Sequence, residues 1–416
     1  MRILFLCNKS PWPPKEGGPM AMNMLIEGLI QHGHKVKVLA VNSYKYHIPA
    51  SSIPDSYQNK TKIELIEVDL HLKPLDAFLN LFTSESYHVK RFISESFRKQ
   101  VIAALNNEEY HIVQLESLFM CPYISTIREY SDARIVLRAH NIERLIWERI
   151  AHESSNPVKK WYIGHLTRTL GKFEDRVVSE VDGILPITAT DAKYFEGVIQ
   201  KTIHQDLSHN TRPSEQKQTL VTEIPFGVDA GKYEHPDINI EFPSIFSLGS
   251  MNWIPNQEGI RWFIDQVWPD VHRQFPDLKY YLAGRAMPDW MKSLDLPNVS
   301  VLGEIEDASR FLAGKAIMVV PIFSGSGIRV KIIEGMAAGK TIISTTLGAE
   351  GINYTHRKNI LIADSPCEFF EMISICVSDP DTCHKLGREA KQLIRTSYQP
   401  AVLIQKLVAF YEQLRR

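Results

Sequence analysis

Two glycines, two cations and a carboxylate lie close together in the last third of the chain, in a pattern that suits a phosphorylated ligand. The pattern consists of Gly325, Ser326, Gly327, Arg329, Lys331 and Glu334. Small residues leave backbone N–H groups uncovered, and such groups at the start of a helix bind phosphate. The helix dipole disfavours cations in a first turn, and a bound anion would reverse that penalty. We therefore predict an anion-binding turn, with an ordinary glycine-rich turn and solvated charges as the alternative.

The elements around this pattern form a β-α-β unit. An apolar run that begins at Ala316 predicts a buried strand, a helix follows over about 327–338, and Gly339 ends it. Residues 341–345 are β-branched and predict the next strand. Open α/β sheets bind ligands at such turns. Val330 stands where both the Walker loop and the dinucleotide fingerprint require glycine, so the turn is neither of these motifs.

This run resembles the donor-site signature of retaining GT-B glycosyltransferases, in particular glycosyltransferase family 4 (group 1). Family members have two glutamates eight positions apart in this turn and helix. Glu334 matches the second, which the resemblance implies holds the nucleotide ribose. The first, which contacts the donor sugar in the family, falls on Ser326, and this is a departure.

A second departure concerns the charges that bind the diphosphate. After a strand at 245–248, many members have Arg following the glycine that matches Gly249 and Lys near the position of Asn256. Here Ser250 and Asn256 are neutral, and we infer that Arg329 and Lys331 supply the missing charge. The resemblance also implies donor contacts at Gly18, Gly249, Asn256, Arg285, Glu304, Ile305 and Glu350.

The first half of the chain opens as a doubly wound sheet. Residues 2–7 predict a buried strand, residues 8–18 a loop rich in proline and glycine, residues 19–31 a helix and residues 35–41 a second strand. The resemblance implies that Gly17 and Gly18 approach the acceptor and the donor diphosphate. A plain turn is the alternative.

Two further strands of this half end on chemically active side chains. One ends at Glu116, and the next ends at His140 and is followed by Asn141 and Glu143. Side chains at strand ends line the clefts of open sheets, so Glu116, His140 and Glu143 are candidates to line the interdomain cleft. Glu116, Asn141 and Glu143 are expected on its acceptor side. The resemblance implies that His140 contacts the transferred sugar. A capped structural histidine is the alternative.

Composition bounds the remaining possibilities. The chain has 416 residues, a net charge of −1 and 44% hydrophobic content, which suits two globular domains and gives no electrostatic reason to expect nucleic acid. The five cysteines form no CxxC pair, and no apolar run reaches the ~20 residues that span a bilayer. We expect a cytoplasmic protein. Weak peripheral contact with the inner face of a membrane is a further expectation, because residues 142–181 interleave cations with aromatics, although acidic residues in that stretch favour a solvated face.

Together these patterns predict the α/β class and, by resemblance, a GT-B fold of two Rossmann-like doubly wound domains facing a central cleft. We expect an N-terminal acceptor domain at 1–229, a donor domain at 244–397 and a last helix at about 398–416 that packs back on the first domain. Asp379-Pro-Asp381 opens a helix rather than ending a strand, so it predicts an N-cap, not a metal site.

The expected activity is metal-independent transfer, with retention, from a UDP- or GDP-sugar to a hydroxyl of a glycan, a lipid-linked glycan or a small molecule, as in polysaccharide biosynthesis. His140, Arg329 and Lys331 are the expected catalytic residues, and neither a cofactor nor a metal is expected. Two alternatives are a sugar-nucleotide 2-epimerase, which needs no acceptor, and a catalytically silent sugar-nucleotide-binding protein.

Overall fold

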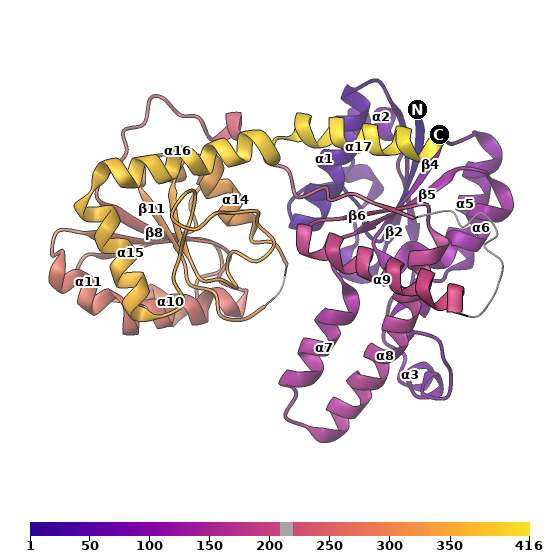
Figure 1. Ribbon diagram of the computed structural model, residues 1–416, viewed down its shortest axis with the longest axis horizontal. Coiled ribbons are helices and arrows are strands. Elements are labelled where there is room, and N and C mark those ends of the chain that lie inside the picture. Colours follow the sequence, from indigo (N-terminus) through magenta and orange to yellow (C-terminus); the bar gives the residue numbers. More distant parts are fainter. Residues whose placement is uncertain (209–218, 326) are drawn as a thin grey trace. The chain divides into compact units, whose positions relative to one another are not determined.

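The computed structural model describes residues 1–208, 219–325 and 327–416. The chain divides into two compact units (Figure 1). Unit 1 consists of Met1–Pro225 and Leu403–Arg416, and unit 2 consists of Phe226–Val402. The chain therefore passes from unit 1 to unit 2 near residue 225, slightly before the expected end of the first domain at residue 229, and returns at its last helix. Ser326, the departure noted above, lies outside the described residues.

Unit 1 contains a parallel sheet of seven strands in the order β3-β2-β1-β4-β5-β6-β7. The strands are β1 (Arg2–Cys7), β2 (Lys35–Asn42), β3 (Glu64–Glu67), β4 (Ile112–Glu116), β5 (Arg134–Ala139), β6 (Gly183–Pro186) and β7 (Leu220–Val221). The chain order reverses between β1 and β4, so the loops after these two strands leave in opposite directions and open a crevice at the carboxyl edge.

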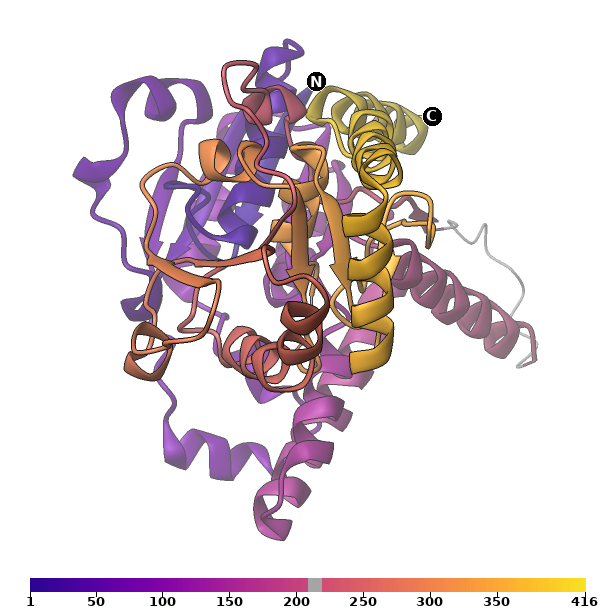
Figure 2. The ribbon, with the colours of Figure 1, turned by 90° about the vertical axis from the view of Figure 1, so that its left-hand side faces the viewer.

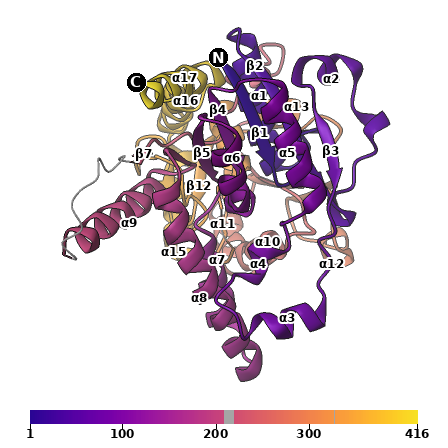
Figure 3. The same cartoon turned by 90° about the vertical axis from the view of Figure 1, so that its right-hand side faces the viewer.

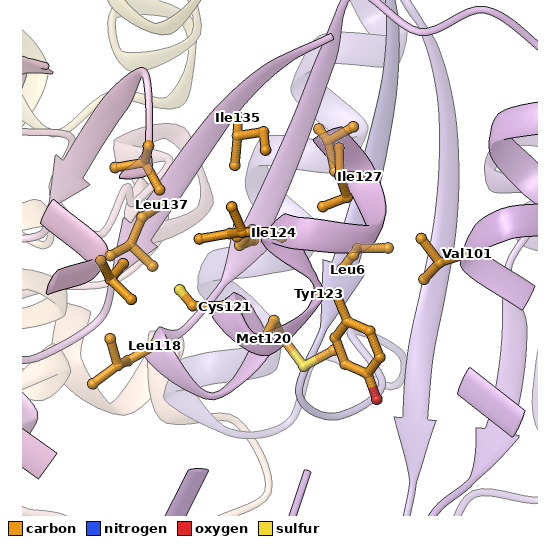
Figure 4. Close-up of a cluster of buried hydrophobic side chains, with 14 of the residues drawn as sticks. Leu6, Val101, Leu118, Met120, Cys121, Tyr123, Ile124, Ile127, Ile135 and Leu137 are labelled. Carbon is orange, nitrogen blue, oxygen red and sulfur yellow. The ribbon is translucent and has the colours of Figure 1, made fainter. Parts of the chain in front are cut away.

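Both faces of this sheet are buried because alternate side chains of each strand point to opposite sides. On β1, Leu4 and Leu6 belong to one hydrophobic cluster, and Ile3 and Phe5 belong to the other. Figure 4 shows part of the first cluster, in which side chains such as Ile124 and Ile127 meet strand residues such as Leu6. Such continuous apolar strands are typical of parallel sheets covered on both faces.

The helices of unit 1 cover these faces and also extend beyond them. They are α1 (Gly17–Gln31), α2 (Asp55–Thr61), α3 (Pro74–Asn80), α4 (Tyr87–Lys90), α5 (Glu95–Asn107), α6 (Ile124–Tyr130), α7 (Glu143–Glu153), α8 (Pro157–Glu180), α9 (Ala189–Ser208) and α17 (Pro400–Arg415). The stretch at 142–181 that interleaves cations with aromatics contains the pair α7 and α8, which projects from unit 1 with α3 beside it (Figures 1 and 3).

The last helix, α17, belongs to the core of unit 1. Its apolar side chains lie in the same cluster as those of α1 and one face of the sheet, and they are Leu403, Ile404, Leu407, Phe410, Tyr411 and Leu414. Gly28 of α1 permits the close approach, because a Cβ there would overlap the side chain of Ile404. The last helix thus completes the cover of the sheet on the side of α1.

Unit 2 contains a parallel sheet of six strands in the order β10-β9-β8-β11-β12-β13. The strands are β8 (Ser244–Leu248), β9 (Lys279–Ala283), β10 (Val299–Gly303), β11 (Ile317–Val320), β12 (Thr341–Ser344) and β13 (Leu361–Ile362). The helices are α10 (Ile254–Gln266), α11 (Trp268–Gln274), α12 (Asp289–Lys292), α13 (Ala308–Ala313), α14 (Val330–Ala337), α15 (Pro366–Ser378) and α16 (Pro380–Ser397). Figure 2 shows this sheet toward the viewer with helices around it.

The order of unit 2 reverses between β8 and β11, so its crevice opens between the turns that follow these two strands. The prediction of two doubly wound α/β domains is confirmed. Within the described parts of the chain, no helix is long and apolar enough to cross a bilayer.

Candidate functional site

The anion-binding turn predicted at 325–331 follows β11, at the crevice of unit 2. The helix α14 begins at Val330 and has Arg329 as its N-cap, so it starts later than the predicted residue 327. The reason is local, because Gly325 and Gly327 have φ angles of +97° and +84°, which a right-handed helix does not allow. The glycines therefore form a turn before the helix rather than its first residues.

Trp253 ties this turn to the one that follows β8. A Cβ on Gly325 would lie 2.7 Å from the Trp253 ring, so the indole packs directly on the glycine. The Arg329 guanidinium lies 5.2 Å from the centroid of the same ring, and its Nη1 donates to the Gly327 carbonyl. Arg329 is buried, so the ring and the turn hold its charge in place.

Lys331 reaches across to the turn after β8. Its Nζ donates to Asn256 Oδ1 over 2.7 Å, and Asn256 Nδ2 donates to the Ser250 carbonyl over 2.8 Å. A Cβ on Gly249 would lie 3.5 Å from Lys331 Nζ. The lysine ammonium thus lies against Asn256, the position near which the resemblance expects a lysine.

The surroundings of Lys331 disfavour its charge in the absence of a ligand. Burial, with a smaller contribution from the nearby Arg329 charge, lowers the pKa of Lys331 to about 7. A doubly charged anion bound here would favour the protonated form.

Arg285 brings a third cation to the same turn. Its Nε donates to Ser250 Oγ over 3.0 Å, and its carbonyl accepts from the Met251 N–H over 2.9 Å. Ser250 is the position at which many group members have arginine. The guanidinium therefore comes from the neighbouring strand end instead, at a residue for which the resemblance implied a donor contact.

The turns that end β8, β9 and β10 are packed against one another. Gly284, with φ of +147°, has no room for a Cβ because one would overlap the Gly249 carbonyl oxygen. Its N–H donates to the Gly303 carbonyl over 2.7 Å. The predicted donor residues Glu304, exposed, and Ile305, half-buried, directly follow Gly303. Glu350 is half-buried after β12.

Glu334, the predicted ribose ligand, lies one turn into α14 and has a partner that the sequence did not reveal. Tyr233 donates its hydroxyl to Glu334 Oε1 over 2.9 Å. Burial raises the pKa of Glu334, and the hydrogen bond from Tyr233 opposes that shift. Burial also raises the pKa of Tyr233, and the Glu334 carboxylate adds to this shift. Tyr233 therefore orients the carboxylate through one oxygen.

In unit 1 the predicted residues gather at the carboxyl ends of β1, β4 and β5. Gly17 and Gly18 are the first residues of α1, two residues earlier than the predicted start, and Gly17 is exposed. Lys9 lies beside them, with its Nζ 3.2 Å from Glu16 Oε2 and 3.3 Å from the position of a Cβ on Gly18. Lys9 is a cation at this helix start that the sequence analysis did not single out.

His140 and Glu116 form a pair at neighbouring strand ends. His140 Nε2 lies 2.7 Å from Glu116 Oε2, and the Glu116 side chain is fully buried. Gln114 donates to Glu116 Oε1 over 2.5 Å, and Tyr411 of α17 donates to Gln114. Glu116 thus supports His140 from beneath and offers an acceptor no surface of its own, which corrects the expectation that it lines a cleft. The ring nitrogen that remains for another contact is Nδ1.

Asn141 and Glu143 follow at the start of α7. Burial raises the pKa of Glu143 to about 7, and a hydrogen bond with the Asn141 side chain opposes this shift. The Glu143 N–H donates to Glu174 Oε1 over 2.9 Å, and burial raises the pKa of Glu174 to about 7 as well. Two carboxyl groups with raised pKa values therefore adjoin the His140 strand end.

Among the residues described by the structure, no three His, Cys, Asp or Glu side chains are grouped as a metal ion would require. The Asp379 side chain accepts from the Thr382 N–H over 3.1 Å, which confirms the predicted N-cap of α16.

A known protein family matches part of unit 2, the unit that contains Arg285, Arg329 and Lys331. Residues 242–379 match the family model described as "Glycosyl transferases group 1". The matched residues all lie within unit 2. A curated relative, an uncharacterized 44.6 kDa protein in the cps region of Klebsiella pneumoniae, is 22% identical over 386 residues, which are 89% of this chain and 90% of the relative.

Solved structures show the fold of the whole chain. HepE of Anabaena, in complex with UDP and glucose, is 13% identical, with a TM-score of 0.61 and coverage of 99% of this chain and 100% of HepE. Sucrose-phosphate synthase from Thermosynechococcus elongatus is 13% identical, with a TM-score of 0.65 and coverage of 100% and 99%. The predicted GT-B fold is confirmed. Together, the family match and this fold support a glycosyltransferase.

Proposed function

We propose that the protein is a retaining glycosyltransferase that transfers a sugar from a UDP- or GDP-sugar to a hydroxyl group. The observation that carries this proposal is the convergence of three cations on the turn after β8. Arg329 lies over Trp253, Lys331 donates to Asn256, and Arg285 donates to Ser250. Ser250 and Asn256, which are neutral where many family members are charged, thus each contact a cation from another part of the chain, Arg285 and Lys331 respectively. Two solved structures of similar fold, HepE with UDP and glucose and a trehalose-6-phosphate protein of E. coli with UDP-2-fluoro glucose, favour a UDP-sugar as the first candidate donor.

The chemistry of this site follows from the charge that develops on the leaving group. A nucleoside diphosphate departs with additional negative charge, and fixed cations in a partly buried turn stabilise that charge without a metal ion. The Glu334 carboxylate would accept hydrogen bonds from the ribose diol, with Tyr233 holding its other oxygen in place. The backbone N–H groups of the turn at Gly325 and Gly327 would donate hydrogen bonds to the phosphates.

The acceptor side of the proposal rests on unit 1. His140 would contact the transferred sugar through Nδ1, because Nε2 faces Glu116. The acceptor would be a hydroxyl of a glycan, a lipid-linked glycan or a small molecule, close to Asn141, Glu143 and Gly17. A lipid-linked acceptor would require a protein that acts at the cytoplasmic face of a membrane.

A thermal-shift panel of nucleoside diphosphates and their sugars tests the donor. A true donor stabilises the folded protein by mass action, by about 2.7 kcal/mol at a hundredfold excess over its Kd. Products formed with the best donor then distinguish the reaction class. Transfer to an added glycan acceptor would support the proposal. Interconversion of the donor sugar without acceptor would indicate an epimerase, and binding without turnover would indicate a silent binding protein.

A further inference from the structure

The segment that contains α3 has its polar and apolar residues arranged opposite to an ordinary surface helix. Its outer side presents Leu75, Phe78, Leu79 and Phe82, which are 54–77% exposed. Its inner side instead buries polar residues such as Asn80, which is 3% exposed. The Phe78 and Phe82 rings contact each other edge to face, with centroids 5.6 Å apart. An apolar outer face of this kind marks an interaction surface.

Hydrogen bonds hold the segment that contains α3 to the rest of unit 1. The buried Tyr87 accepts from the Lys73 N–H over 3.0 Å and donates to the Lys73 carbonyl over 3.2 Å. Arg91 donates to the Leu70 carbonyl, and Asn80 donates to Thr83 over 3.0 Å. The fold therefore holds the apolar side chains in an outward position at both ends of the segment.

The first half of α8 adds positive charge at the same end of unit 1. Figures 1 and 3 both place α3 and the start of α8 at the end that projects away from the sheet. Residues 157–173 contain four cations and no aspartate or glutamate, and the cations are Lys159, Lys160, Arg168 and Lys172. Trp161, 64% exposed, and Val158 lie among them. A cationic helix with an exposed tryptophan suits the interface of an anionic membrane.

A groove along the same helices offers room for headgroups. It measures about 590 Å³ between α7 and α8, and Lys160, Arg168 and Lys172 line it. The acidic Asp175 in its wall is paired with Arg144 over 2.9 Å, whereas Glu148 remains as an opposing charge. The groove therefore has an excess of cations, as binding of phosphate headgroups requires.

We infer that α3 and the first half of α8 form a docking surface for an anionic lipid membrane, with Phe78 and Phe82 entering the acyl boundary and the α8 cations meeting the headgroups. A second copy of this chain would match the apolar side chains but not the uniform positive charge of residues 157–173. The inference deepens the proposed function, because the membrane would present a lipid-linked acceptor to the protein. In that respect it rests on the proposed function.

Vesicle co-sedimentation tests the inference with the full chain and without any donor or acceptor, so that it can fail independently of glycosyl transfer. Wild type should bind phosphatidylglycerol vesicles and bind phosphatidylcholine vesicles much less. The double variant Phe78→Ser/Phe82→Ser should bind at least about tenfold more weakly. Lys159→Gln/Lys160→Gln should bind about fivefold more weakly per lysine, and salt should reduce the binding of wild type.

The matched control is Tyr130→Ser/Ile240→Ser, which removes two exposed apolar side chains elsewhere and should bind as wild type does. Equal melting temperatures show that the variants fold. Binding to anionic vesicles that the phenylalanine variant retains would overturn the inference. So would a wild-type dimer in solution, without vesicle binding, that the same variant dissociates, because the surface would then join two copies of this chain.

Discussion

The lowered pKa of Lys331 makes the proposed diphosphate site testable through protons. Without ligand, burial and Arg329 hold the pKa of this lysine at about 7, against an ordinary value of 10.5. A nucleoside diphosphate beside the ammonium would favour the charged form and raise that pKa again. Binding at alkaline pH should therefore take up a proton from solution.

The magnitude follows from the two protonation states. At pH 8, a lysine with a pKa of about 7 is roughly 10% charged, so a complex that restores its ordinary pKa takes up about 0.9 proton. At pH 6 the lysine is already about 90% charged, and the uptake by this group falls to about 0.1 proton. The Kd should accordingly rise about tenfold per pH unit above pH 7 until the pKa of the complex is reached.

Calorimetry of UDP binding in buffers of different ionisation enthalpy measures this uptake as the slope of observed enthalpy against buffer enthalpy. Lys331→Met should abolish the slope at pH 8. At pH 6, where wild type is charged, the same variant should weaken UDP by about 10- to 100-fold, because a charged hydrogen bond is worth roughly 1.5–3 kcal/mol. Lys340→Met is the control, since burial lowers the pKa of Lys340 to about 8 but its ammonium bonds to the Ala313 and Lys315 carbonyls, away from the glycine turn.

Two results would refute this reasoning. A zero slope for wild type at pH 8 would mean that the ligand does not change the charge of Lys331. A slope that persists in Lys331→Met but disappears in Lys340→Met would mean that Lys340, and not Lys331, takes up the proton.

Four other outcomes are expected. Glu334→Ala should lower the affinity for UDP by ~2–4 kcal/mol, while the 2′,3′-dideoxy analogue of UDP should bind wild type and variant alike in calorimetry. If the variant still binds UDP more tightly than the dideoxy analogue, that result would argue against a contact between Glu334 and the ribose. Arg285→Gln should weaken the binding of UDP by about two- to fivefold, because an exposed charge contributes little, and it should leave the binding of uridine unaffected. Substitution of another exposed arginine, Arg273→Gln, should change the binding of neither ligand. Donor turnover should persist in excess chelator, and activity that returns only with magnesium or manganese would contradict a metal-free leaving group. Because burial raises the pKa of Glu174 from 4.5 to about 7, its contribution to stability is complete below about pH 4.5 and is lost as pH rises through 7, so Glu174→Gln should melt with a shallower decline between pH 5 and 7.5 than wild type.

The fold was largely predictable because its signals are local. Apolar runs such as residues 2–7 define buried strands, and the regular alternation of strand and helix defines two doubly wound sheets. The start of α14 was misplaced because the sequence does not state that Gly325 and Gly327 take left-handed backbone angles. The predicted N-cap at Asp379 succeeded because its partner, Thr382, is only three residues away.

The parts of the site that sequence reasoning missed depend on contacts between distant residues. Tyr233 meets Glu334 from 101 positions away, out of the stretch between the two expected domains. Trp253 and Arg285 join the turn only because β8, β9 and β11 are neighbours in the sheet. The charge of Lys331 was anticipated, but its contact with Asn256 depends on how far α14 lies from α10. A pattern of residue types cannot supply that distance.

The path of α17 also governs how the molecule would respond to a break in its backbone. Unit 2 is inserted between two parts of unit 1, and the second part contributes Ile404, Leu407 and Phe410 to a shared core. A protease that cut the crossing near residue 225 would therefore not set unit 1 free, since α17 would still link the two fragments through that core. The nicked protein would run as one species on a sizing column and as two bands in denaturing gels. The close packing of Gly28 against Ile404 would help to hold the two fragments together without a covalent bond.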